Sequence, residues 1–203
     1  EMVLLPRFEM DQVLATIRRK PPTLFFAVPT IFNVLGALPD SKVPDLSTVR
    51  SSVSGGAPLP LDVRRQFEAR CKSPISEGYG LTEASPIITC NPLLGSAAVK
   101  DNSAGPAFPQ TIIELRDPET GDIVSGANQR GEVCAREPQV MQGYWNRPDA
   151  TEATFIHGAL RTGDIGYLDE DGYLFLVDRI KDIILCSGYN VYPRVIEDAA
   201  YEH

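Results

Sequence analysis

The sequence predicts an α/β protein with a largely parallel sheet and helices, followed by a smaller β-rich, barrel-like subdomain. Helical and strand patterns alternate up to about Asn91, which is typical of a parallel sheet. Short strands separated by turns follow. Of the 203 residues, 43% are apolar and 23% are charged, a composition that can form a buried core. We expect subdomains at 1–95 and 96–178, and a third segment at 179–203.

The first region opens with a helix whose apolar face is Met10, Val13, Leu14 and Ile17, and Pro21-Pro22 ends it. Strands and helices then alternate, with a strand at Leu24–Val28, a helix from Pro29 to about Leu38, a strand at Val49–Ser54, a helix from Pro60 to about Cys71 and a strand at Ile75–Tyr79.

The second region reads as short strands around one short helix at about Asp149–Phe155. A hairpin signal, Asp169–Gly172, joins two of the strands. This pattern favours a small barrel or sandwich. The expected strands are Thr111–Leu115, Glu132–Ala135, Leu160–Thr162, Gly166–Leu168 and Tyr173–Val177. In the third segment we expect a strand at Ile183–Cys186, a turn at 187–190 and a helix that opens at Pro193.

Charge and composition exclude several classes of protein. Nineteen Lys and Arg against 27 Asp and Glu give a net charge of −8, which argues against a nucleic-acid partner but not against one small anionic ligand. No apolar run approaches the roughly 20 residues of a membrane span. The four cysteines are far apart, so we expect buried free thiols in a reducing, cytoplasmic compartment. The chain begins without Met and stops inside an expected helix, so we expect an internal piece of a longer protein.

Two loops after strands combine residues that suit a nucleotide. In the first, Gly55, Gly56, Ala57 and Pro58 would let backbone groups approach a flat ligand, although the same residues suit a plain tight connection. The second is Glu77-Gly78-Tyr79-Gly80-Leu81-Thr82-Glu83. Here a Tyr ring between two glycines suits stacking on a base, a Thr hydroxyl suits a phosphate oxygen, and a Glu carboxylate suits Mg²⁺. A packed Tyr and a solvated Glu would fit this loop equally well.

Two further segments are rich in polar groups. Arg161-Thr162-Gly163-Asp164 precedes a strand, and a carboxylate at a strand mouth can accept bonds from both hydroxyls of a ribose. Asp164 could equally be a turn former. The run Asp178-Arg179-Ile180-Lys181-Asp182 joins the last two regions, where a solvated linker is the ordinary interpretation.

Together, in this order and spacing, these segments resemble the adenylate-forming superfamily of acyl-CoA synthetases, aryl-CoA ligases, nonribosomal adenylation domains and firefly-type luciferases. The resemblance extends from Leu24 to Glu197. Three runs are most similar to bacterial fatty-acyl-CoA ligases: Tyr79–Glu83, Gln142-Gly143-Tyr144-Trp145 and Asp178–Pro193. It implies the later part of a large nucleotide-binding domain and the truncated start of a small C-terminal domain.

The resemblance also implies roles for these residues. The segment Gly55–Pro58 would line the adenine edge, with Tyr79 stacked on the ring. Thr82 would touch the α-phosphate and Glu83 would hold Mg²⁺, while Asp164 and Arg179 would hold the ribose.

Two more positions match the small domain's start. Lys181 matches a hinge between the large and small domains, and Gly188 matches the glycine beside the pantetheine tunnel of coenzyme A. The implied reaction joins a carboxylic acid to coenzyme A through acyl-AMP, with ATP and Mg²⁺.

The family's phosphate loop and its catalytic lysine have no match here, so the resemblance implies that this piece alone is inactive. Glu137, Ala159 and Val195 depart from the family pattern. An aryl-CoA ligase, a luciferase-like enzyme and a non-catalytic nucleotide-binding module stay as alternatives. The acyl group, the oligomeric state and a peripheral membrane contact of the parent protein stay open.

Overall fold

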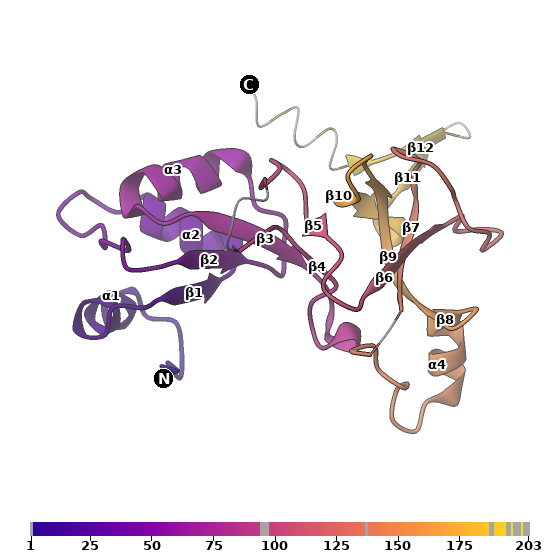
Figure 1. Cartoon of the computed structure of the whole chain (residues 1–203), viewed down its shortest axis with the longest axis horizontal. Coiled ribbons are helices and arrows are strands. Elements are labelled where there is room, and N and C mark those ends of the chain that lie inside the picture. Colours follow the sequence, from indigo (N-terminus) through magenta and orange to yellow (C-terminus); the bar gives the residue numbers. More distant parts are fainter. Residues whose placement is uncertain are drawn as a thin grey trace. The chain divides into compact units, whose positions relative to one another are not determined.

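The computed structural model of the chain describes residues 2–93, 98–136, 138–186, 189–193, 196 and 200 (Figure 1). They form two compact units: Glu1–Glu77 with Pro92–Asp101, and Gly78–Asn91 with Asn102–His203. The boundary between the two units falls inside strand β3 (Ile75–Tyr79), since the last two residues of this strand belong to the second unit. The candidate loop around Tyr79 is therefore part of the β-rich unit.

The first unit confirms the predicted α/β alternation. Its strands β1, β2 and β3 are parallel, with Leu24 opposite Ser51 and Ser52 opposite Ile75. The elements before β3 are α1 (Met10–Arg19), β1 (Leu24–Ala27), α2 (Pro29–Gly36), β2 (Ser51–Ser54) and α3 (Leu61–Cys71).

The core of the first unit forms where α2 and α3 pack together. Phe32 of α2 meets Phe67 of α3 edge to face, with ring centroids 4.9 Å apart, and both side chains are fully buried. A Cβ at Gly36 would lie 3.3 Å from the backbone nitrogen of Phe67, so glycine permits this close approach. Helix α2 ends at Gly36, two residues earlier than predicted. Leu38 precedes Pro39, which disfavours helical backbone there, yet Leu38 still packs against the core.

The second unit is built on an antiparallel sheet, in agreement with the β-rich region that the sequence predicts. Its strand order is β5-β10-β9-β7-β6, and β8 pairs with β9. The residues Gly78 and Tyr79 of β3 pair antiparallel with Cys90 and Thr89. The elements are η1 (Thr82–Ala84), β4 (Thr89–Cys90), β5 (Gly105–Pro106), β6 (Ile112–Arg116), β7 (Gly131–Arg136), α4 (Pro148–Thr154), β8 (Phe155–Ile156), β9 (Ala159–Leu168) and β10 (Tyr173–Arg179).

One prediction for this sheet is wrong in detail. Leu160–Thr162 and Gly166–Leu168 are not two strands but parts of one strand, β9, so Asp164 lies within a strand rather than at its mouth. Gly163 has φ +75°, and the register with β7 shifts between Glu132 and Cys134. A bulge of this kind lets a strand continue through a residue that signals a turn.

The third segment begins with η2 (Ile180–Asp182), β11 (Ile184–Cys186) and β12 (Tyr189–Val191), the last two paired antiparallel. The helix expected to open at Pro193 falls largely outside the described residues, as do Glu137, Gly188 and Val195. Across the described part of the chain, no helix is long and apolar enough to cross a membrane. Cys71, Cys90 and Cys134 are buried free thiols, as predicted.

Candidate functional site

Three residues predicted to contact a nucleoside lie together in the second unit. The Tyr79 hydroxyl donates to Oδ2 of Asp164 at 2.6 Å, and Nε of Arg179 lies 3.3 Å from Oδ1 of the same carboxylate. The Asp164 side chain is 15% exposed and that of Arg179 is 60% exposed. Burial, followed by the charge of Asp164, raises the pKa of Tyr79, so its hydroxyl stays a donor at neutral pH. The Asp164 carboxylate is thus fixed from both sides.

The bulge in β9 sets the direction of the Asp164 backbone. The Thr162 hydroxyl donates to the carbonyl oxygen of Val133 at 2.7 Å and accepts from the N–H of Asp164 at 3.2 Å. The N–H of Gly163 donates to Oε1 of Glu132 at 3.2 Å. Neighbouring strand β7 therefore holds the bulge through a side chain and through its backbone.

Glu132 anchors this arrangement as a buried ion. Its side chain is 3% exposed, and a terminal nitrogen of Arg161 lies 2.7 Å from its Oε2. Nε of Arg161 also donates to this oxygen at 2.8 Å. The hydrogen bond to Glu132 is the main reason that the pKa of Arg161 is raised, which keeps the guanidinium charged. A buried carboxylate needs such partners.

The loop after Tyr79 is held tightly by its own backbone. A Cβ at Gly80 would overlap the carbonyl oxygen of Pro86, so this position accepts glycine alone. The N–H of Ile88 donates to the carbonyl oxygen of Tyr79 at 2.9 Å. Between these points the short helix η1 presents Thr82, which is exposed, and Glu83, which is half-buried.

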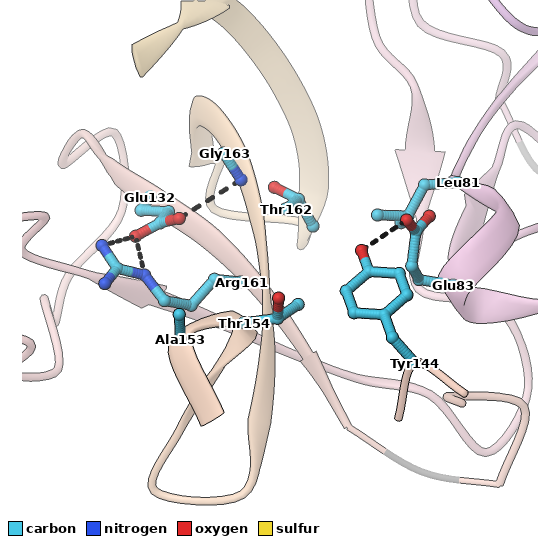
Figure 2. Close-up of a pocket in the computed structure, with 9 residues that line it drawn as sticks. All are labelled: Leu81, Glu83, Glu132, Tyr144, Ala153, Thr154, Arg161, Thr162 and Gly163. Carbon is cyan, nitrogen blue, oxygen red and sulfur yellow. Dashed lines mark hydrogen bonds and ion pairs between the residues drawn. The ribbon is translucent and has the colours of Figure 1, made fainter. Parts of the chain in front are cut away.

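Glu83 lines a cavity of about 300 Å³ within the second unit. Figure 2 shows the Tyr144 ring directed toward Glu83, and the Tyr144 hydroxyl donates to Oε1 of that carboxylate at 2.7 Å. Thr162 and Gly163 of the bulge line the same cavity, with Arg161 beside them. The cavity thus joins the candidate metal ligand to the strand that carries Asp164. Next to Tyr144, Trp145 is the single tryptophan of the chain and is 90% exposed.

The donor set around Glu83 fits a magnesium ion that is shared with a substrate. Among the described residues, no group of three or more His, Cys, Asp or Glu side chains could hold a metal by itself. Mg²⁺ is usually bound through one or two carboxylates, waters and substrate phosphates rather than in an all-protein cage. One carboxylate at the wall of a polar cavity matches that manner of binding.

The remaining predicted residues lie apart from this cluster. In the first unit, Gly56, Ala57 and Pro58 are exposed, and Gly56 has φ +84°. The N–H of Gly55 donates to the carbonyl oxygen of Ala27 at 3.3 Å. Glu77 pairs in register with Ser54 at the end of β2, and Gly78 is buried.

Lys181 is exposed on η2, directly after β10. Gly188 lies outside the described residues.

Two residues of the site were missed by the sequence analysis as functional candidates. Glu132 reads as an ordinary strand residue, and its contact with Gly163 spans 31 residues. Tyr144 lies in the family-like run Gln142–Trp145, and its hydroxyl donates to Glu83, 61 residues earlier in the chain. A carboxylate in an otherwise apolar strand was the one signal available for Glu132.

Known proteins resemble this chain along its whole length. A family model described as AMP-binding enzyme matches residues 1–145. A long-chain-fatty-acid–CoA ligase of Bacillus subtilis is 43% identical over 203 residues, and a 4-coumarate–CoA ligase of Narcissus pseudonarcissus is 38% identical over 206 residues. Each alignment covers 100% of the chain and 36% of the relative, so the chain spans about a third of their length.

A solved structure agrees with these matches. The O-succinylbenzoate coenzyme A synthetase of Bacillus subtilis, in complex with ATP and magnesium ion, superposes with a TM-score of 0.83 at 32% identity. The match covers 97% of this chain and 40% of that one. The sequence motifs, the α/β and antiparallel units and these matches agree, and the chain belongs to the AMP-binding enzyme family.

Proposed function

We propose that the chain is the nucleotide-binding part of an AMP-forming acid–thiol ligase. In this reaction a fatty acid attacks the α-phosphorus of ATP to give acyl-AMP and pyrophosphate. The thiol of coenzyme A then displaces AMP to give the thioester. The observation that carries the proposal is the Asp164 carboxylate held between Tyr79 and Arg179, in the same unit as Glu83 at the cavity wall.

In this proposal, each candidate site residue has a role in binding ATP. Asp164 would accept hydrogen bonds from the ribose hydroxyls, with Arg179 beside it, and the Tyr79 ring would stack on the adenine. Thr82 would donate to the α-phosphate, and Glu83 would bind Mg²⁺ together with phosphate oxygens. When bound, the metal supplies positive charge that stabilises the charge developing on the phosphates. The segment Gly55–Pro58, in which Gly56, Ala57 and Pro58 are exposed, would line the adenine edge. Glu77, Gly78 and Gly80 would flank Tyr79 in its loop.

A fatty acid is the first candidate substrate because the Bacillus subtilis relative at 43% identity carries that name. An aromatic acid is the second, because a 4-coumarate–CoA ligase is 38% identical over the same span. The test is pyrophosphate release by the complete gene product with ATP and Mg²⁺, comparing octanoate, palmitate and 4-coumarate. Faster release with the fatty acids supports the first candidate, and faster release with 4-coumarate supports the second.

AMP binding without pyrophosphate release from ATP in the presence of any of these acids would instead support a non-catalytic nucleotide-binding module. The 203-residue chain by itself spans about a third of its relatives. We expect it to bind AMP weakly, with a Kd of about 1 mM, and to release no pyrophosphate. Release at the rate of the complete gene product would contradict this expectation.

A further inference from the structure

The segment before α4 touches Glu83 at two points. The N–H of Met141 donates to the Glu83 backbone carbonyl at 2.7 Å, and the Tyr144 hydroxyl donates to Oε1 of its carboxylate at 2.7 Å. Both the backbone and the side chain of Glu83 are therefore held by the same four-residue stretch. A carboxylate bound on one oxygen by a fixed donor has fewer orientations available than a solvated one.

Tyr144 can act as a fixed donor because α4 holds its backbone. The N–H of Tyr144 donates to the Thr151 hydroxyl at 2.9 Å, and that hydroxyl donates to the Arg147 carbonyl at 2.8 Å. Gly143 has φ +150°, and a Cβ there would lie 2.7 Å from Cγ2 of Thr151. The chain thus passes close to α4 just before Tyr144, in a conformation that favours glycine.

We propose that Tyr144 is a positioning residue for Glu83: its hydroxyl orients the carboxylate so that the other oxygen serves a divalent cation bound with a nucleotide. The inference rests on the proposed function, because that function makes Glu83 a metal ligand. Hydrogen bonds of this kind fix the orientation of metal ligands, and their loss typically weakens metal binding about 10–100-fold. Figure 2 shows the Tyr144 hydroxyl and the Glu83 carboxylate facing each other at the cavity.

The alternative role of the Tyr144 hydroxyl predicts the opposite change in cation affinity. If the Tyr144 hydroxyl only occupied an oxygen that the cation needs, removing it would strengthen cation binding. The substitution Tyr144→Phe separates the two cases because it removes one oxygen atom and keeps the ring. Tyr167→Phe is a matched control, since Tyr167 stacks on Phe175 with ring centroids 5.0 Å apart and is not placed at the cavity.

The experiment measures binding of Mn²⁺, as a paramagnetic substitute for Mg²⁺, to the complete gene product with α,β-methylene-ATP. Water-proton relaxation enhancement reports the bound Mn²⁺–nucleotide complex without turnover. We expect Tyr144→Phe to raise the Kd of this complex about tenfold or more, with the Kd of the nucleotide alone unchanged and Tyr167→Phe like the wild type. An unchanged or lower Kd for Tyr144→Phe overturns the proposal.

A third variant distinguishes this inference from the proposed function. Glu83→Gln should raise the Kd of the Mn²⁺–nucleotide complex at least as much as Tyr144→Phe. If Glu83→Gln has no effect, the proposed metal site is wrong and the inference falls with it. If Glu83→Gln weakens binding while Tyr144→Phe does not, the metal site stands and the positioning role of Tyr144 is wrong.

Discussion

The Asp164 side chain is held in position by its protein neighbours in the absence of a ligand. Its two oxygens have different partners, one a neutral hydroxyl that stays protonated and the other an exposed guanidinium. The guanidinium of Arg179 can move on its flexible side chain, whereas the Tyr79 ring packs against the core of the second unit. A polyol that binds here would meet a carboxylate whose orientation is already restricted, which lowers the entropic cost of binding.

The first prediction concerns Asp164→Ala. We expect the affinity for AMP to fall tenfold or more, because charge-assisted hydrogen bonds contribute about 1.5–3 kcal/mol each. Calorimetry with AMP on the complete gene product measures this, and Glu170→Ala, on the exposed tip of the β9–β10 hairpin, is the control. Equal affinities for Asp164→Ala and the wild type would show that Asp164 only shapes the bulge.

The second prediction concerns the buried ion Glu132. Glu132→Gln keeps an acceptor for the Gly163 N–H but leaves the Arg161 charge unpaired, so we expect the free energy of unfolding to fall by about 3 kcal/mol. Urea denaturation measures the change. The control is Arg147→Gln, in a pair whose side chains are 65% and 74% exposed, where we expect less than about 1 kcal/mol. Similar losses for the two variants would contradict a special role for burial at Glu132.

At the scale of elements, the sheet of the second unit is stabilised along β6 and β7 by a cluster of charges. Glu114 accepts from Nε of Arg136 at 2.5 Å and from a terminal nitrogen of Arg116 at 2.6 Å. Arg116 is nearly buried and also donates to the carbonyl oxygen of Gly121 at 2.7 Å. The three side chains thereby connect neighbouring strands to the turn that follows β6.

This cluster predicts a pH dependence of stability. Burial by itself would raise the pKa of Glu114, but hydrogen bonds from Arg136 and Arg116 and their charges hold it below its usual 4.5. A carboxylate with a lowered pKa in the folded state stabilises the fold above its unfolded-state pKa, and this is lost as pH falls through the folded-state pKa.

We therefore expect the wild type to lose stability below about pH 4.5 more steeply than Glu114→Gln, which is less stable at pH 7 by about 2 kcal/mol. Thermal unfolding across pH 3–7 measures this. Glu119→Gln, at an exposed turn position, should follow the wild type. Parallel profiles for Glu114→Gln and the wild type would refute the prediction.

The sequence predicted elements well where local patterns decide them. The strand at Leu24, the helix ending at Cys71 and the strand at Tyr79 follow from periodicity and from flanking prolines. The continuity of β9 did not follow, because Gly163 signals a turn and a bulge equally, and only pairing with β7 selects the bulge. Likewise the contact of Tyr144 with Glu83 depends on tertiary packing, which no local pattern encodes.

At the scale of the whole molecule, the chain leads from the residues proposed to bind the nucleotide into the segment expected to be a hinge. Arg179 ends β10, and Lys181 follows it within the short helix η2, exposed on the surface. The residue proposed to contact the ribose and the expected hinge residue are therefore two positions apart. Movement at η2 would act directly beside Arg179, where the proposed ribose contact is made.

The last prediction tests that hinge. Proline fixes φ near −65° and removes a backbone N–H, so Lys181→Pro should restrict rotation at η2. In the complete gene product we expect thioester formation to fall at least tenfold more than pyrophosphate release, whereas Lys181→Ala should affect the two half-reactions alike. Equal loss of both half-reactions in Lys181→Pro would indicate misfolding or a static linker.

Trp145 is an intrinsic fluorescent probe next to Tyr144, one of the residues that line the cavity. All indole fluorescence of the chain comes from this one ring, which is 90% exposed and is covalently adjacent to Tyr144. A solvated indole emits at long wavelength and is readily quenched by iodide, and both properties change when a neighbour shields the ring. A titration of the 203-residue chain with AMP, Mn²⁺ or coenzyme A can therefore be followed optically at the residue next to Tyr144, which lines the cavity. The spectrum would report changes beside Tyr144, separately from the chemistry at the phosphates.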